Sequence, residues 1–219
     1  MNKTAVRVDD CIPISPELVS ASGLQPAMLF EIAVAAGDQL LAGAQSIDWD
    51  ESFRVALLRQ RRHFDAQLPE CLALEDISIA AQLSKNLVKM MSALRESLPH
   101  GSVAMSPVIP GYHWISSGVG DYSVGQCLIE VKCTNKHFSS SDYRQIIMYW
   151  LLSYAAAVEG GPPEWSTGVL LNPRLNLMVS FSFTEIIRNV GAGRSKVDIL
   201  ELFSSIVCGR ANPMLEAEL

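Results

Sequence analysis

The sequence has no apolar run long enough to cross a membrane. Its longest candidate, from Ile146 to Val158, includes tyrosine and serine and is shorter than the roughly 20 residues that span a bilayer. The first residues, MNKTAVRVDDCIPISPE, also lack the apolar centre of a signal peptide. We therefore expect a protein without a membrane anchor that stays in the cytoplasm.

Cysteine is scarce and shows no metal-binding spacing. The chain has five cysteines, an odd number, and none of them forms a CxxC pair. Cys127 and Cys133 flank a strand-like run. In a reducing compartment, this usage favours small buried thiols over a disulfide framework or a zinc site.

The sequence also has few charged residues. Charged residues make up 18% of the 219 residues and the net charge is −6, which argues against broad, non-specific binding of polyanions but leaves room for a local basic groove. Apolar residues make up 49%, enough for a real core. The length suits one sizeable domain with a helical extension.

The motifs of several common enzyme classes are missing. Neither GxxxxGK[ST] nor GxGxxG occurs, and the glycine-rich GAGR near residue 191 follows a helix-like segment, so we expect no phosphate loop. The sequence has no GxSxG and no recognisable order of Ser, His and Asp, which argues against acyl transfer.

Residue patterns predict a mixed α+β chain. An extended arm is expected over residues 1–25, a helical extension over 26–74 and the main domain over 75–219. Hydrophobic spacing and turn residues predict helices over 26–42, 50–64, 75–98 and 142–159, a β meander over 106–133, a hairpin of strands 166–171 and 177–183, and helices over 183–190 and 195–207. This order is α+β or mixed α/β rather than a doubly wound nucleotide fold.

The most informative stretch is GDYSVGQCLIEVK, residues 120–132. If Gly125 and Gln126 form a two-residue turn, Asp121 lies directly opposite Glu130, with β-carbons about 4.5 to 5.5 Å apart, and Lys132 shares their face. Two opposed carboxylates repel each other, so the fold should supply a cation: the Lys132 ammonium or a divalent metal.

Oxygen ligands of this kind suit Mg²⁺ or Mn²⁺. The alternative is a surface hairpin on which Glu130 and Lys132 form a weak ion pair, worth about 0 to 1 kcal/mol.

The following helix adds a second motif. Gln145 and Tyr149 are four residues apart and share one helix face, with Arg144 alongside. With Gly120-Asp121 and the LIEVK strand that carries Glu130 and Lys132, this order of residues resembles the PD-(D/E)XK nuclease superfamily, and within it the RecB-like branch marked by a QxxxY helix. The resemblance covers residues 105 to 185.

The resemblance implies a restriction-endonuclease-like core, in which helices flank a central β-sheet, and a metal-dependent nuclease. By analogy, Asp121, Glu130 and the Val131 carbonyl would bind one or two Mg²⁺ or Mn²⁺ ions. Lys132 would position the attacking water or help to deprotonate it. The QxxxY helix would contact the nucleic-acid strand through Gln145 and Tyr149.

Other residues receive weaker predictions. Lys136 and Arg144 flank the predicted site and could contact phosphates. One predicted helix has a basic side, and a solvated surface is the favoured interpretation of it. Its basic residues are Arg54, Arg59, Arg61, Arg62 and His63. Tyr112 and Trp114 could stack on a base, although core packing is favoured, and Arg174 is expected to order a hairpin turn.

One feature departs from the family pattern. Relatives often carry a further acid or a histidine on the helix before the meander, yet helix 75–98 has no acid between Asp76 and Glu96. Asp76 is the first candidate, although an ordinary charge at the start of a helix is favoured for it. The remaining candidates are Glu75, Gln82, Asn86, His100 and His113.

The leading hypothesis is therefore a nuclease that hydrolyses phosphodiester bonds of DNA, with RNA a less favoured substrate. Phage defence, repair or mobile-element biology would be its usual settings. A second hypothesis is a non-catalytic subunit of the same fold that serves nucleic-acid recognition or complex assembly, and a third is a metal-independent binding module. The high apolar content also predicts association, either with a second copy or with a protein partner.

Overall fold

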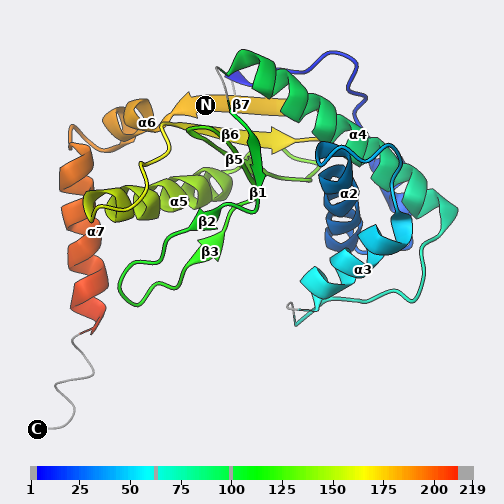
Figure 1. Ribbon diagram of the computed structural model, residues 1–219, viewed down its shortest axis with the longest axis horizontal. Coiled ribbons are helices and arrows are strands. Elements are labelled where there is room, and N and C mark those ends of the chain that lie inside the picture. The colour runs from blue at the N-terminus through cyan, green and yellow to red at the C-terminus, as the bar shows by residue number, and fades with distance from the viewer. Residues whose placement is uncertain (1–3, 62–63, 99–100, 212–219) are drawn as a thin grey trace, which may run out of the picture. The chain divides into compact units, whose positions relative to one another are not determined.

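A computed structural model describes residues 4–61, 64–98 and 101–211. The chain is a mixed α+β protein, as the sequence predicts. In chain order its elements are α1 (Pro16–Ala21), α2 (Pro26–Leu41), α3 (Trp49–Gln60), α4 (Leu74–Ser97), β1 (Val103–Met105), β2 (Val108–Ile109), β3 (Gly118–Val119), β4 (Tyr122–Val124), β5 (Cys127–Val131), α5 (Ser140–Val158), β6 (Thr167–Asn172), β7 (Leu177–Ser182), α6 (Phe183–Val190) and α7 (Lys196–Ala211) (Figure 1). None of the described helices combines the length and apolarity of a membrane span.

Five strands form one sheet in the order β1-β4-β5-β6-β7, and β2 and β3 form a separate antiparallel pair. Both β1 and β5 pair with β4 in antiparallel orientation. Helix α5 joins β5 to its sheet neighbour β6, a crossover of the kind that joins parallel strands. The predicted helix over 142–159 and the two strands after it are present as α5, β6 and β7. The meander expected over 106–133 is only partly correct, because β2 and β3 pair apart from the main sheet and β1 begins before residue 106.

The chain divides into two compact units that alternate along the sequence. The first comprises Met1–Pro99, Val131–His137 and Leu171–Val179, and the second comprises His100–Glu130, Phe138–Leu170 and Ser180–Leu219. The boundary along β5 falls at the peptide bond between Glu130 and Val131.

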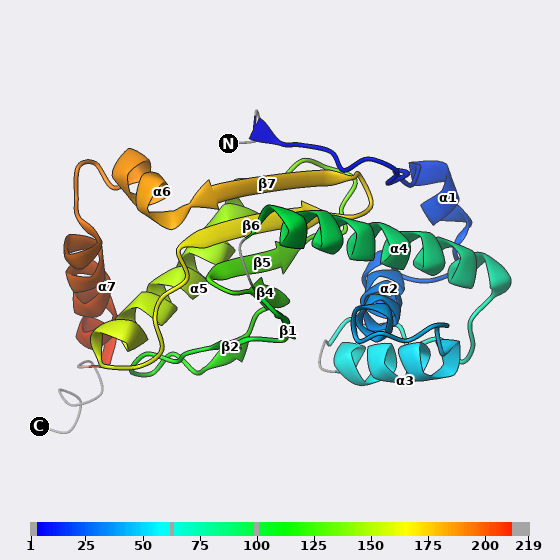
Figure 2. The same cartoon turned by 45° about the horizontal axis from the view of Figure 1, so that its top comes forward.

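Helix α2 is the centre of the first unit. It packs against both α3 and α4 (Figure 2), and its buried Met28, Leu29 and Ile32 join Leu83 of α4 in one apolar cluster. Gly37 allows close approach of α4, because a β-carbon there would lie 3.0 Å from a methyl group of Leu87. The helical spacing of apolar residues seen in the sequence is thus used to bury one face of each helix.

The N-terminal segment is held by the backbone and by two buried asparagines. Val6 and Met178 exchange hydrogen bonds of 2.8 and 2.9 Å between their backbones. The Asn176 amide donates to the carbonyls of Val8 (2.8 Å) and Cys11 (3.1 Å), while its oxygen accepts from the Val8 N–H at 3.0 Å. These contacts give residues 6–11 a fixed course.

Asn86 on α4 holds the next part of this segment. Its amide donates to the carbonyl of Ile12 at 2.7 Å and to that of Pro173 at 2.8 Å. The expectation of a wholly extended arm is wrong after this point, because residues 16–21 form α1. The cause is local: the Ser15 hydroxyl accepts a hydrogen bond from the Leu18 N–H, and Pro16 occupies the first helical turn.

Aromatic side chains organise the second unit. Trp150 of α5 is buried and stacks on both Tyr154 and Phe183, with ring centroids 5.6 and 5.4 Å apart. Tyr112 and Trp114 hold α7: the Tyr112 hydroxyl lies 2.6 Å from the Ser204 hydroxyl, and the Trp114 indole donates to the Val207 carbonyl at 2.8 Å. The favoured interpretation of core packing is wrong for Trp114, which is 56% exposed, and Tyr112 is only half-buried. Both residues instead make contacts with α7.

Replacing Asn176 should release the N-terminal segment. Asn176 is 4% exposed and has a φ of +51°, so Asn176→Ala loses three hydrogen bonds and places alanine in the left-handed region. We expect a loss of about 3 kcal/mol or more in the free energy of unfolding, measured by urea denaturation. Asn176→Gly should lose less, because glycine relieves the backbone strain but not the missing hydrogen bonds.

Asn135 provides the control for this prediction, because it is exposed in a loop. Asn135→Ala should change the stability by less than about 0.5 kcal/mol. Limited proteolysis of Asn176→Ala should cut within residues 4–14 earlier than in wild-type protein. A wild-type urea midpoint for Asn176→Ala would contradict the structural role of this side chain.

Candidate active site

The β4–β5 hairpin has the predicted register. Tyr122 pairs with Ile129, Ser123 with Leu128 and Val124 with Cys127, which leaves Gly125 and Gln126 as a two-residue turn. Gly125 has a φ of +55°, whereas Gln126 is not among the residues of positive φ, the pattern of a type II′ turn with glycine at its first central position. Glycine therefore sets the register of the hairpin.

Asp121 and Glu130 each lie one residue beyond the outermost pair of this ladder, Tyr122 and Ile129. Asp121 lies immediately before β4 and is half-buried, and its carbonyl accepts a 2.9 Å hydrogen bond from the Ser106 N–H. Glu130 is the fourth residue of β5. The paired residues end at Tyr122 and Ile129, so the pairing of Asp121 with Glu130 stays a prediction, made by continuing this register one residue further.

Burial separates this hairpin from an ordinary surface hairpin. Every residue of β4 and β5 is buried, and Glu130 is only 4% exposed. A weak, solvated Glu–Lys pair on a surface hairpin is therefore the wrong interpretation of this stretch. Burial of a carboxylate is costly unless hydrogen bonds or cations compensate the charge, so a specific environment must stabilise Glu130.

Gln145 of α5 supplies part of this environment. Its side-chain amide donates to Glu130 Oε1 at 2.7 Å and to the Tyr149 hydroxyl at 2.9 Å. The start of α5 is fixed by a capping box, in which Ser139 and Asp142 hydrogen-bond each other's backbone N–H. The cap sets the rotation of the helix, and so Gln145 meets Glu130 from the helix face that it shares with Tyr149.

The sequence alone does not reveal this role of Gln145. The resemblance predicts nucleic-acid contact for the QxxxY pair, whereas the Gln145 amide in the structure bonds to a strand carboxylate. The four-residue spacing of Gln145 and Tyr149 does predict that both side chains lie on one face of the helix. Arg144, the neighbouring cation, is exposed.

The remaining predicted site residues follow Glu130 along the chain and belong to the first unit. Val131 is buried and ends β5, and the Lys132 N–H donates to the Leu171 carbonyl at 2.7 Å. Lys132 is half-buried and Lys136 is exposed. Residues two apart in an extended chain project to the same side, the relation expected for Glu130 and Lys132.

The donor set on this stretch fits a hard divalent cation. Two carboxylates, from Asp121 and Glu130, and the Val131 carbonyl are oxygen ligands of the kind that Mg²⁺ and Mn²⁺ prefer. In the part of the chain that the structure describes, no group of three or more His, Cys, Asp or Glu side chains could hold a metal ion. Any metal bound here would therefore rely on two side-chain carboxylates and the backbone.

The helix candidate Asp76 has an ordinary structural role. It is 4% exposed, and its two oxygens accept hydrogen bonds from the Ser22 hydroxyl at 2.6 Å and from the Ala73 N–H at 3.0 Å. The second of these bonds caps the start of α4, the helix-start role that the sequence analysis favoured.

The other candidates for this ligand have different surroundings. Gln82 donates to the oxygen of Asn86 at 3.0 Å, and Asn86 holds the N-terminal segment, so both amides take part in packing. Glu75 is exposed. His113 is also exposed and lies 3.5 Å, measured at Nε2, from the Cys208 sulfur. His100 lies outside the described residues.

The basic side of α3 is largely engaged in local ion pairs. Arg54 contacts Glu51 at 2.6 Å, and Arg59 contacts both Glu31 and Asp38, at 3.3 and 3.2 Å. Arg61 is exposed, and Arg62 and His63 lie outside the described residues. This side of the helix agrees with the favoured interpretation of a solvated surface.

Three of the five cysteines are shielded as predicted. Burial raises the pKa of the Cys127 thiol to about 12 and, despite the nearby Arg174 charge, that of Cys133 to about 12; it also raises the pKa of Cys11. The expectation of buried thiols is wrong for Cys71 and Cys208, which are exposed. All five are free thiols.

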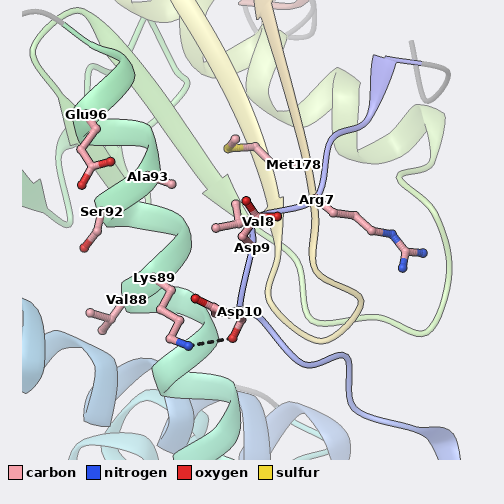
Figure 3. Close-up of a pocket in the computed structure, with 10 residues that line it drawn as sticks. All are labelled: Arg7, Val8, Asp9, Asp10, Val88, Lys89, Ser92, Ala93, Glu96 and Met178. Atoms are coloured by element: carbon pink, nitrogen blue, oxygen red, sulfur yellow. Dashed lines mark hydrogen bonds between the residues drawn. The ribbon is translucent and has the colours of Figure 1, made fainter.

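A hollow of about 600 Å³ lies within the first unit, between the N-terminal segment and α4 (Figure 3). Its charged lining is mixed, with Asp9, Asp10 and Glu96 beside Arg7 and Lys89, and the Lys89 ammonium donates to the Asp10 carbonyl at 2.7 Å. None of the predicted site residues lines this hollow.

Manganese should stabilise the folded protein through Glu130. A metal that binds only the native state raises the melting temperature by mass action, and we expect a rise of roughly 5 to 10 °C at a hundredfold excess over Kd. Glu130→Gln should lose most of this rise, because it removes a ligand charge with little change in volume. Glu201→Gln, at an exposed α7 position, is the matched control and should keep it. Equal shifts in the two variants would exclude Glu130 from metal binding.

No family model, curated protein or solved structure matches the chain.

Proposed function

We propose that this protein is a metal-dependent nuclease of the PD-(D/E)XK type that hydrolyses phosphodiester bonds of DNA. One observation carries the proposal: Glu130, buried in β5, accepts a hydrogen bond from Gln145 of a QxxxY helix. An ordered, buried carboxylate beside a second carboxylate suits a catalytic cation better than a structural ion pair.

The chain's own residues have separable roles in this proposal. Asp121, Glu130 and the Val131 carbonyl hold the Mg²⁺ or Mn²⁺. The bound ion would polarise the phosphate and lower the pKa of a coordinated water. Gln145 orients Glu130, so the ligand is in place before substrate arrives. Lys132, two residues after Glu130, stabilises the negative charge that develops on the attacked phosphate and positions the water.

In this proposal, cationic residues that follow Lys132 in the sequence contact the substrate. Lys136 and Arg144 are both exposed and can reach phosphate oxygens without disturbing the core. The net charge of −6 confines attraction for a polyanion to such local sites. DNA is preferred over RNA as the substrate on the strength of the family resemblance.

A second candidate is a non-catalytic protein of the same fold that recognises nucleic acid or joins a larger assembly. One observation favours it: the helix residues best suited to add a metal ligand, Asp76 and Asn86, are occupied by hydrogen bonds to the chain. A site with only two carboxylate side chains would bind metal more weakly than one with three.

Cleavage assays separate these candidates. Single- and double-stranded DNA and RNA are each incubated with wild-type protein and manganese, and in parallel with chelator. We expect manganese-dependent cleavage of DNA by wild-type protein and by the surface control Glu201→Gln, and none by Glu130→Gln. Wild-type protein that neither cleaves nor gains stability from manganese would leave the non-catalytic candidate in place.

Lys132 should affect turnover rather than metal binding. Lys132→Met should lower the cleavage rate about 10²- to 10³-fold, the usual cost of removing one electrostatic stabiliser of a transition state. The manganese-induced rise in melting temperature should remain. Lys85→Met, at an exposed α4 position, is the control and should cleave normally. Tyr149→Phe should slow cleavage less, because it keeps the ring and loses only the hydroxyl. Normal cleavage by Lys132→Met would remove Lys132 from the mechanism.

A further inference from the structure

Arg174 is a buried cation with an unusual environment. It lies in the turn between β6 and β7 and is 8% exposed. Its Nε is buried and has no hydrogen-bond partner, and no carboxylate among the described residues forms an ion pair with the guanidinium. The other arginine with a partly buried guanidinium, Arg59, contacts two carboxylates.

This arrangement is costly for the protein alone. A guanidinium cannot lose its proton at any physiological pH, so it cannot escape the cost of burial by becoming neutral as a lysine does. An unpaired buried charge costs several kcal/mol. Arg174 therefore needs a negative partner that the described chain does not supply.

The expected role of Arg174, ordering the hairpin turn, is performed by other groups. The Asn172 side-chain oxygen accepts hydrogen bonds from the backbone N–H groups of Arg174 at 3.1 Å and Leu175 at 3.2 Å. The Arg174 carbonyl accepts from the Ile14 N–H at 2.8 Å. All of these bonds use the Arg174 backbone, so its side chain is not needed to form the turn.

The turn that carries Arg174 lies beside the segment that follows β5. The Asn172 amide donates to the Thr134 carbonyl at 3.0 Å, which ties the two segments together. The segment after β5 also carries Lys132 and Lys136. Arg174 thus lies on a turn that is bonded to a segment with two further cations.

We propose that Arg174 binds an oxyanion of the phosphate class beside the Lys132 segment. A guanidinium presents a planar fork of N–H donors that matches two phosphate oxygens. The assignment of the oxyanion as a phosphodiester of nucleic acid rests on the proposed nuclease function; the anion site itself does not. Arg174 then holds a phosphate of the nucleic acid and is a positioning residue.

The first test is thermal unfolding in inorganic phosphate and in chloride at equal ionic strength. Wild-type protein should melt about 3 to 6 °C higher at a phosphate concentration ten times Kd. Arg174→Met should lose this rise, and in chloride it should melt no lower than wild type, because it replaces an unpaired buried charge with an apolar side chain of similar length. Arg188→Met, at an exposed position on α6, should keep the phosphate effect.

The opposite results would overturn the proposal. If phosphate does not raise the melting temperature of wild-type protein, or if Arg174→Met keeps the rise, Arg174 is not an anion site. Arg174→Lys provides a second variant that keeps the charge but loses the planar fork, and its phosphate-induced rise should be smaller than that of wild type. An equal rise in Arg174→Lys would contradict recognition through the fork.

A final comparison separates this proposal from the nuclease function. Glu130→Gln should keep the phosphate-induced rise even though it does not cleave. A short single-stranded oligonucleotide without terminal phosphates, added to Glu130→Gln in chelator, should raise its melting temperature, and Arg174→Met in the same background should abolish that rise. If only inorganic phosphate acts, the oxyanion site stands and its assignment to nucleic acid is wrong.

Discussion

The burial of Glu130 is the constraint on which the organisation of the candidate site depends. A carboxylate in a strand whose residues are all buried must be compensated within the fold, because water is not there to solvate it. The Gln145 amide meets this need from α5. Its geometry depends in turn on the Ser139 cap, which fixes where the helix begins. Three separate parts of the sequence thus determine the surroundings of the Glu130 carboxylate. The Gly125 turn sets the strand register, the Ser139 cap fixes the start of α5, and the Gln145 amide donates the hydrogen bond.

Local signals in the sequence were sufficient to predict these parts. The Gly125-Gln126 turn predicted the strand register, in which Tyr122 pairs with Ile129 and Val124 with Cys127. The Ser139 cap and the apolar spacing predicted α5. Each of these features is decided within a few residues, so neighbouring residues contain the information. The burial of Glu130 was not predictable in this way, because it depends on elements brought together only by folding.

Long-range polar contacts were missed for the same physical reason. The sequence does not show that Asn86 and Asn176 will hold a segment more than 70 residues away, and an amide on α4 was equally compatible with a metal ligand. The short helix α1 was missed for a different reason. Its Ser15 cap and Pro16 are visible in the sequence, but a helix of six residues has too few apolar positions to show a period.

Buried polar groups in this chain fall into two classes, and the difference between them is informative. Asp76, Asn86 and Asn176 have hydrogen-bond partners in the chain that account for their burial. The Arg174 Nε has no such partner among the described residues, although the Arg174 N–H bonds to Asn172 within the turn and its carbonyl accepts from the Ile14 N–H. Natural structures leave few buried polar groups unsatisfied, because each one costs stability in every folded molecule. We infer that a ligand supplies the missing hydrogen-bond partner of such a group. The free energy that burial costs in the unliganded protein is then recovered only with a ligand that can accept this hydrogen bond, which makes binding selective.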